Sequence, residues 1–358
     1  MTLPQPHIGA MASYQLANLE APEGTRLISM AQNESLRAPS PLALDAAHMA
    51  LSAGATYPDP DWSELRAAIS LVHGLPEDRI LCGAGSMELI ASIANAYLGT
   101  GDEVLTSDYA YAFIKTVTQF TNARFCSVPE INLAVSTDAL IGGITPATKI
   151  VFVANPGNPT GTRISSAKLR ELRQALPENI LLIIDEAYGE FSDHLDERLF
   201  DLSETTNTII LRTLSKSYGL AGMRVGWGCF PEHISEQVRK ILNPNNVSIA
   251  SQSAATAAMH DQDYMSETCR ITAQLRDRFS EQLQELDIQV KSSHTNFVLL
   301  QFRNNAEASH ANRHLVKNGI LMRQMQGYGL GHCLRATIVA QDDMMFVTTR
   351  LNEWSRTR

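Results

Sequence analysis

Long hydrophobic runs are missing from this chain of 358 residues. The longest, "KIVFVAN" and "NILLIIDEAY", are far shorter than the roughly 20 apolar residues that cross a bilayer as a helix, and both include polar or charged residues at their ends. We therefore expect no membrane segment. The beginning, "MTLPQPHIGAMASYQ", also lacks the basic start and continuous apolar stretch of an export signal, so we expect a cytoplasmic protein.

Cysteine and positive charge are scarce as well. The five cysteines are an odd number without a C-x-x-C pair, which argues against a disulfide framework and for reduced thiols. Lysine and arginine number 29 against 38 acidic residues, a net charge of -9, so the overall field repels a phosphate backbone. A nucleic-acid partner is not expected. The remaining composition, 44% hydrophobic and 19% charged, is that of an ordinary folded protein.

Signature motifs of several other enzyme classes are also absent. The chain has no G-x-x-x-x-G-K-[ST], and "GAGSME" lacks the third glycine of the dinucleotide fingerprint G-x-G-x-x-G. His310 and His314 form the only close histidine pair and lie on a predicted exposed helix, which indicates a solvated face rather than a zinc site. Nucleotide and metal chemistry therefore have no support.

Predicted helices and strands alternate between about residue 60 and residue 262. Apolar side chains recur at helical spacing in 61–75 and 86–99, and 165–176 is a further helical stretch. Short, mostly apolar runs predict strands at 103–107, 124–128, 149–155, 180–188, 207–215 and 224–230. This order is typical of an α/β protein with a mainly parallel sheet and right-handed crossovers.

The pattern changes after residue 262. A long charged helix at 263–286 precedes a strand at 296–302, a helix at 307–319 and strands at 319–324 and 333–339, which predicts a smaller α+β unit. We expect a large domain at 45–262 and a small domain formed by 1–44 together with 263–358. No linker, low-complexity segment or internal repeat separates them.

Three consecutive strand predictions run directly into unusual polar segments. "KIVFVAN" opens into "PGNPTGT", the next run into "DEAYGEF" and the third into "LSKSYGL", which supply Asn158, then Asp185 and Tyr188, then Lys216. Taken singly, these are an ordinary turn, a helix cap, a packed tyrosine and a surface lysine. Ligands in parallel sheets bind beyond the carboxyl ends of the strands, however. The joint occurrence therefore predicts one site.

These segments carry a family resemblance. "NPGNPTG", "DEAYGEF" and "TLSKSYGLAGMRVGW" resemble the signatures of fold-type I pyridoxal 5′-phosphate (PLP) enzymes, specifically the class I/II aminotransferases. "AQNESLRAPSP", "TYPDPDWSELRAAI", "GAGSMELI" and "GILMRQMQGYGLGHCLRATI" resemble the histidinol-phosphate aminotransferase family in order and spacing, from about Tyr14 to Thr337. The resemblance implies a fold-type I PLP-transferase, with a mainly parallel seven-stranded sheet flanked by helices, a smaller α+β domain and a homodimeric assembly.

The resemblance also implies the residues that bind and use PLP. Lys216 matches the lysine whose amine condenses with the cofactor's aldehyde and, once released, moves the proton of the substrate's α-carbon. Asp185 matches the carboxylate that keeps the pyridine nitrogen protonated. Asn158 and Tyr188 match hydrogen-bond partners of the phenolic oxygen, and Tyr109 matches the aromatic residue that stacks on the ring. Lys216, Asp185 and Tyr188 are the expected catalytic residues.

A second set of residues matches the family's phosphate-binding positions. Arginine and hydroxyl side chains, together with backbone N–H groups at a helix start, suit an anion. The implied phosphate ligands are Thr213, Ser215, Arg224, Gly85, Ser86, Met87 and, reaching across from the neighbouring subunit, Tyr57.

Substrate contacts are implied for five residues. Arg335 matches the arginine that receives the anionic end of the substrate, and Arg323 supplies a second guanidinium, which suits a divalent phosphate. Tyr14 matches a lid tyrosine near the substrate, and Asn33 and Tyr57 complete the set. We therefore expect a ping-pong exchange of an amino group between L-histidinol phosphate and 2-oxoglutarate.

Three departures from the family pattern leave the amino donor open. Val339 stands where the family has glycine, Met87 replaces a frequent acid, and Asn245 occupies a common aromatic position. Relatives that accept aromatic or other amino acids share the same motifs, as do PLP-dependent decarboxylases of the threonine-phosphate type. Both alternatives remain.

Overall fold

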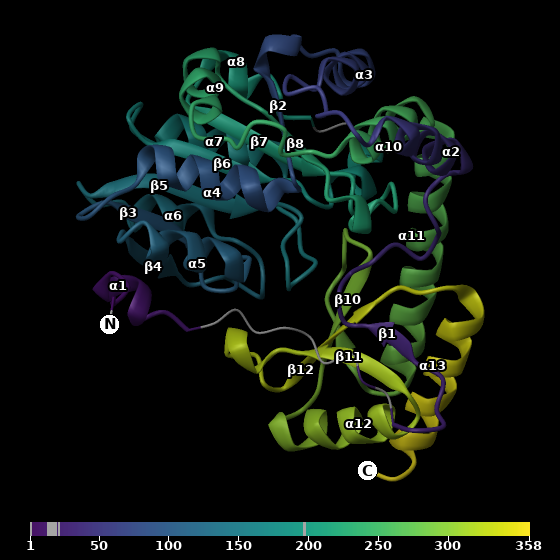
Figure 1. The fold of residues 1–358 in the computed structure, drawn as a ribbon. Helices are drawn as coiled ribbons and strands as arrows, with labels where there is room; N and C mark the ends of the chain where they lie inside the picture. Colours follow the sequence, from purple (N-terminus) through teal and green to yellow (C-terminus); the bar gives the residue numbers. More distant parts are fainter. Residues whose placement is uncertain (1, 13–19, 21, 196–197) are drawn as a thin grey trace.

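The computed structural model describes residues 2–12, 20, 22–195 and 198–358. Two sheets lie in separate halves of the molecule, and the 24-residue helix α11 (Gln262–Glu285) runs from one half to the other (Figure 1). Among the helices in these ranges, none combines the length and the apolar character needed to span a bilayer.

The larger sheet has seven strands in the order β2-β8-β7-β6-β5-β3-β4. Strand β8 is antiparallel to both neighbours and the other pairs are parallel, which confirms the predicted mainly parallel α/β sheet. The strands are β2 (Ile80–Gly83), β3 (Glu103–Ser107), β4 (Arg124–Val128), β5 (Thr148–Ala154), β6 (Leu181–Asp185), β7 (Thr208–Thr213) and β8 (Gly226–Cys229). Strand β2 was not predicted, because three apolar residues followed by a glycine are too few to show a periodicity.

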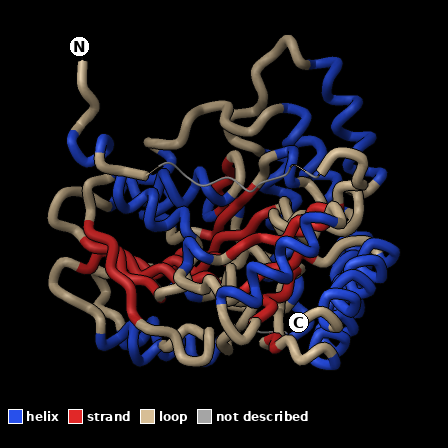
Figure 2. Tube along the Cα trace, turned by 90° about the horizontal axis from the view of Figure 1, so that it is seen from below, coloured by secondary structure: helices blue, strands red, loops and turns tan. Residues whose placement is uncertain are grey.

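Helices cover both faces of this sheet (Figure 2). Strands β6 and β7 are buried along their whole length, which explains the run of Leu and Ile in each of them. The α-helices described in this half are α1 (Pro6–Gly9), α2 (Pro41–Ala50), α3 (Ser63–His73), α4 (Ser86–Tyr97), α5 (Ala112–Phe120), α6 (Thr137–Gly142), α7 (Ser166–Ala175), α8 (Leu202–Thr205), α9 (Glu232–Arg239) and α10 (Ile249–His260).

The smaller sheet joins the two ends of the chain. Its order is β1-β11-β12-β10-β9, and β1 pairs in parallel with β11, so the N-terminal segment contributes a strand to the C-terminal unit. The elements are β1 (Ile28–Met30), β9 (Gln289–Val290), β10 (Phe297–Gln301), α12 (Asn305–Lys317), β11 (Ile320–Gln324), β12 (Cys333–Thr337) and α13 (Gln341–Ser355). Because β1 belongs to the smaller sheet, we propose that the chain divides as predicted, into a large domain at 45–262 and a small domain formed by 1–44 together with 263–358.

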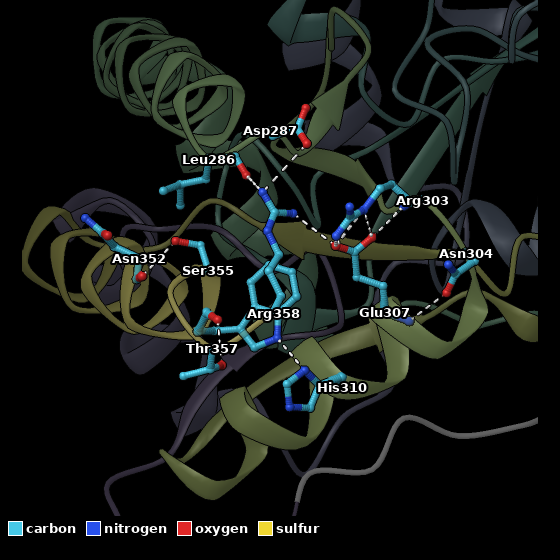
Figure 3. A network of polar contacts seen from close by, with 11 residues as sticks. Leu286, Asp287, Arg303, Asn304, Glu307, His310, Asn352, Ser355, Thr357 and Arg358 are labelled. Atoms are coloured by element: carbon cyan, nitrogen blue, oxygen red, sulfur yellow. Dashed lines mark hydrogen bonds and ion pairs between the residues drawn. The ribbon is translucent and has the colours of Figure 1, made fainter.

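A polar cluster fastens the last residues of the chain to the small domain (Figure 3). The Arg358 guanidinium donates to Glu307 Oε1 at 3.0 Å and to the Leu286 carbonyl, and it lies 5.2 Å from the Trp354 ring centroid. Glu307 also accepts from Arg303 at 2.8 Å. Its hydrogen bonds, first of all the one from Arg303, lower the pKa of Glu307 to about 2. The cluster therefore joins the ends of α11, α12 and α13.

Candidate active site

The three predicted polar segments meet at one cavity. Strands β5, β6 and β7 are neighbours in the sheet, so the segments that follow their carboxyl ends lie side by side. The cavity has a volume of about 710 Å³. Its lining includes most of the predicted site residues, namely Asn33, Ser86, Met87, Asn158, Asp185, Tyr188, Thr213, Ser215, Lys216, Arg224, Arg323 and Arg335.

Lys216 follows the end of β7, and its amine points toward the segment after β1. Lys216 Nζ donates to the Asn33 carbonyl at 2.9 Å and lies 3.4 Å from the Gln32 carbonyl. Burial lowers the pKa of Lys216 from 10.5 to about 8, and the nearby charge of Arg335 acts in the same direction. A substantial fraction of the amine is therefore neutral, and hence nucleophilic, near physiological pH.

Asp185 is the last residue of β6 and is only 5% exposed. Its Oδ1 accepts the Ala187 backbone N–H at 3.1 Å. Burial nevertheless raises the pKa of Asp185 from 3.8 to about 7, because the Ala187 bond and the distant Lys216 charge offset the lost hydration only in part. A cationic group placed beside this carboxylate would restore its ionised form.

Asn33 connects the lysine to the tyrosine. Its backbone carbonyl accepts from Lys216, while its side-chain Nδ2 donates to Tyr188 Oη at 2.7 Å. Asn33 has a φ of 54°, a left-handed conformation that asparagine tolerates better than most residues. Tyr188 packs edge-on against Phe297, with ring centroids 5.3 Å apart, and burial raises its pKa to about 12. The phenol therefore keeps its proton at neutral pH.

An anion-binding cradle forms where α4 begins. Gly85, with a φ of 83°, precedes the first helical residue Ser86, and a Cβ at Gly85 would lie 2.5 Å from Arg224 Nη2. Only glycine permits this close approach. Arg224 Nη1 donates to Ser215 Oγ at 3.3 Å, and Thr213 Oγ1 donates to the same oxygen at 3.0 Å. A helix N-terminus, a guanidinium and two hydroxyls thus face one region of the cavity.

Two arginines reach the cavity from the small sheet. Arg323 on β11 and Arg335 on β12 are register partners in an antiparallel pair. Arg335 donates to the Ala31 carbonyl at 3.0 Å and to Asn158 Oδ1, and its Cζ lies 5.2 Å from the Phe297 ring centroid. These contacts hold one guanidinium in a fixed orientation, with the second beside it.

The remaining predicted residues lie elsewhere. Tyr109 packs against a small cluster with Leu299 and Cys333, and Tyr111 lines the cavity instead, so the ring-stacking role of Tyr109 stays a prediction. Tyr57 is 87% exposed. Tyr14 lies outside the described residues.

Sequence reasoning missed part of the lining. Tyr111, Lys115 and Tyr328 border the cavity, and Tyr328 Oη accepts the Ala112 backbone N–H at 3.2 Å across 216 residues of sequence. Tyr328 lies inside one of the segments that carry the resemblance, so its place in that segment could have identified it as a site residue.

Comparison with known proteins agrees with this geometry. Residues 25–348 match the family described as "Aminotransferase class I and II". The histidinol-phosphate aminotransferase of Jannaschia sp. (strain CCS1) is 39% identical over 340 residues, which cover 95% of this chain and 94% of the relative. The enzyme of the same name from Ruegeria pomeroyi is 37% identical and covers 94% and 93%.

Solved structures show the same fold. The histidinol-phosphate aminotransferase of Sinorhizobium meliloti in complex with pyridoxal-5′-phosphate superimposes with a TM-score of 0.92 at 26% identity, covering 100% of this chain and 98% of that one. A Thermus thermophilus aspartate aminotransferase variant, at 18% identity and a TM-score of 0.84, shares the fold. These comparisons confirm the predicted resemblance and fold class, and the chain belongs to the class I and II aminotransferase family.

Proposed function

We propose that the protein transfers the amino group of L-histidinol phosphate to 2-oxoglutarate, with PLP as cofactor. The observation that carries the proposal is a partly buried lysine and a buried aspartate at adjoining strand ends of one cavity, with two arginines at the same cavity. The relatives named histidinol-phosphate aminotransferases, at up to 39% identity, support this choice of donor. A cytoplasmic location stays a prediction.

The residues of the cavity fit PLP. The Asp185 carboxylate, whose raised pKa reflects burial without a strong cationic partner, matches a protonated pyridine nitrogen. The cradle of Ser86, Ser215 and Arg224, with Gly85 leaving it open, matches a phosphate. When bound, PLP supplies an aldehyde that captures amines and a ring that stabilises the electron pair left at the substrate's α-carbon.

Lys216 is the residue that moves protons in this reaction. With a pKa of about 8, its amine is neutral more often than that of an ordinary lysine, whose amine is almost always protonated at neutral pH. It therefore takes a proton from the substrate's α-carbon more readily. The Asn33 carbonyl orients the amine, and the phenol of Tyr188, which accepts from the Asn33 side chain and keeps its own proton, would donate a hydrogen bond into the same cavity. Asp185, once a protonated ring nitrogen lies beside it, would be ionised and would hold that proton in place.

Arg323 and Arg335 are placed to bind the anionic groups of both substrates. L-Histidinol phosphate carries a phosphate ester and 2-oxoglutarate carries carboxylates, so each half-reaction brings an anion to the same end of the pocket. Two adjacent guanidiniums offer several fixed donors to either anion. Binding both substrates at one end of the cavity is what an alternating, ping-pong exchange requires.

We also propose a homodimer. Tyr57, exposed by 87%, lies a few residues after α2, and Leu42, Met49 and Leu51 on α2 and the turn after it are exposed as well. Exposed apolar side chains gathered on one element are typical of an interface, and an exposed tyrosine is free to reach the site of a second copy. Coexpressed Lys216→Ala and Tyr57→Ala chains should regain activity, since one of the two sites in a mixed dimer would be intact. Absence of rescue would place Tyr57 outside the partner's site.

The donor is tested by comparing kcat/KM for L-histidinol phosphate, phenylalanine and tyrosine, each with 2-oxoglutarate. We expect the phosphate ester to be preferred by at least about a hundredfold, because only this donor uses both arginines fully. An undetectable rate with the ester would overturn the proposed donor. Release of carbon dioxide from threonine phosphate without a keto product would favour the decarboxylase instead.

A further inference from the structure

A buried cluster of charges lies next to the active site without lining its cavity. Arg212 on β7 is 2% exposed, and its guanidinium contacts three carboxylates. Nε and Nη2 donate to Glu186 Oε2 at 3.0 and 2.8 Å. Nη1 and Nη2 donate to the two Asp193 oxygens at 2.8 and 2.9 Å, and Glu190 Oε1 lies 3.5 Å from Nη1.

Each end of this cluster is one residue from a catalytic side chain. Glu186 follows Asp185, so the bond from Arg212 joins β7 to the residue directly after that aspartate. Ser217 follows Lys216, and its hydroxyl donates to Glu190 Oε2 at 3.1 Å. Arg212 and Glu190 together thus connect the segment that carries Asp185 with the segment that carries Lys216.

Steric contacts hold the guanidinium in place. A Cβ at Gly189 would lie 2.9 Å from Arg212 Cζ, so the chain turns closely around this group. The ring of Phe200 covers it, with its centroid 5.2 Å from Cζ. A lysine at this position would keep the charge but lose the planar set of donors that reaches several acceptors at once.

The electrostatics of the cluster agree with a shared network. One guanidinium faces three acidic groups, and burial raises the pKa of Glu190 to about 7, whereas Arg212 holds the pKa of Asp193 below its ordinary value despite burial. Nearby His73 has a pKa lowered to about 3, chiefly by burial, and stays neutral. The cluster therefore depends on the position of Arg212 for its charge balance.

We propose that Arg212 is a positioning residue, which acts through Glu186 and through Glu190 with Ser217 to set the relative placement of the Asp185 carboxylate and the Lys216 amine. This inference rests on the proposed PLP function, because those two groups must address opposite ends of one cofactor. It needs no particular amino donor.

The chain offers a matched control in Arg173. This arginine is also buried, at 5% exposure, and it donates to the carbonyls of Ile180 at 2.8 Å and Asn207 at 3.2 Å. Those carbonyls directly precede β6 and β7. Arg173 therefore ties together the amino ends of the same two strands whose carboxyl ends carry the active site, and Arg173→Lys removes a comparable set of buried contacts far from the cavity.

The test compares Arg212→Lys and Arg173→Lys in four measurements. These are the melting temperature, the affinity of the apoprotein for PLP, the visible circular dichroism of the loaded protein, and the steady-state kinetics that give kcat and KM. We expect both variants to lose stability. Only Arg212→Lys should weaken PLP binding, by at least about tenfold, change the dichroism and lower kcat more than it raises KM.

Ser217→Ala provides a second route if Arg212→Lys does not fold. It removes only the hydrogen bond to Glu190, and Ser203→Ala is its control, since buried Ser203 donates to the Cys229 carbonyl at 3.2 Å. We expect Ser217→Ala to lower kcat by about three- to tenfold and to alter the dichroism, with Ser203→Ala close to wild type. Equal effects in each matched pair would overturn the inference alone. A wild-type protein that binds no PLP would overturn the proposed function as well.

Discussion

Replacement of Asp185 by asparagine should stabilise the empty protein while destroying its function. The pKa of this buried carboxyl is about 7, against 3.8 for an ordinary aspartate. Each tenfold change in proton affinity is worth about 1.4 kcal/mol, so keeping Asp185 ionised in the folded apoprotein costs at most about 4 kcal/mol. Asparagine has nearly the same shape, carries no charge, and its Oδ1 can still accept the Ala187 N–H.

The sign of the pH dependence follows from the direction of this shift. A carboxyl whose pKa is raised on folding binds its proton more tightly in the native state, so it destabilises the fold as the pH rises from about 4 to 7. The cost is absent below that range and complete above it. Asp185→Asn should therefore be more stable than wild type at about pH 8, by about 1 to 4 kcal/mol, and the difference should vanish near pH 4.

Urea unfolding of the apoproteins across this pH range measures the effect. Glu281→Gln is a suitable control, because this exposed carboxylate on α11 should change stability by less than about 0.5 kcal/mol. With saturating PLP the order should invert, since wild type gains a cationic partner for Asp185 and the variant does not. An Asp185→Asn apoprotein less stable than wild type at about pH 8, or a difference independent of pH, would refute the reasoning.

Three further outcomes are expected. Lys216→Ala should lower kcat by more than about a thousandfold, while its melting temperature stays close to that of wild type. Borohydride reduction of the wild-type protein with PLP, followed by peptide mapping, should label Lys216 and no other residue. Arg335→Lys should raise KM for both L-histidinol phosphate and 2-oxoglutarate by about ten- to a hundredfold with a smaller change in kcat, and a selective effect on one substrate would contradict a shared anion site. Glu307→Gln should lower the free energy of unfolding by about 1 kcal/mol at neutral pH. Because the arginine contacts depress the pKa of Glu307, wild type should lose this advantage as the pH falls from about 4.5 to about 2. Equal stability of the two proteins at neutral pH would show that the cluster contributes nothing.

The sequence predicted the chemistry of the site because that chemistry is local to three strand ends. Asn158, Asp185 and Lys216 each lie at or shortly after the end of a mostly apolar strand, and parallel strands present their carboxyl ends at one edge. The resemblance of the surrounding segments then assigned a role to each residue. The alternation of elements likewise predicted the α/β class, and the boundaries of β3, β4 and β10 differ from the predicted ones by no more than one residue.

Contacts between segments far apart in the chain were decided by the tertiary structure alone. Asn33 was predicted from its motif as a substrate ligand, but no spacing revealed that its carbonyl orients the Lys216 amine across 183 residues, or that its amide holds Tyr188. The same is true of Tyr111, which lines the cavity where Tyr109 does not, because a turn of the chain sets which side chain points inward.

Sequence by itself thus predicted which groups react and in what order they occur along the chain, from the positions of the strand ends and from the resemblance of the segments around them. The tertiary structure decided how strongly each group holds its proton and which neighbours fix it in place. The pKa values of Asp185 and Lys216 arise from burial, and the network of Arg212 arises from side chains on separate segments. Burial and long-range contacts are properties of the packed chain, so they cannot be predicted from the residues that neighbour a group in the sequence.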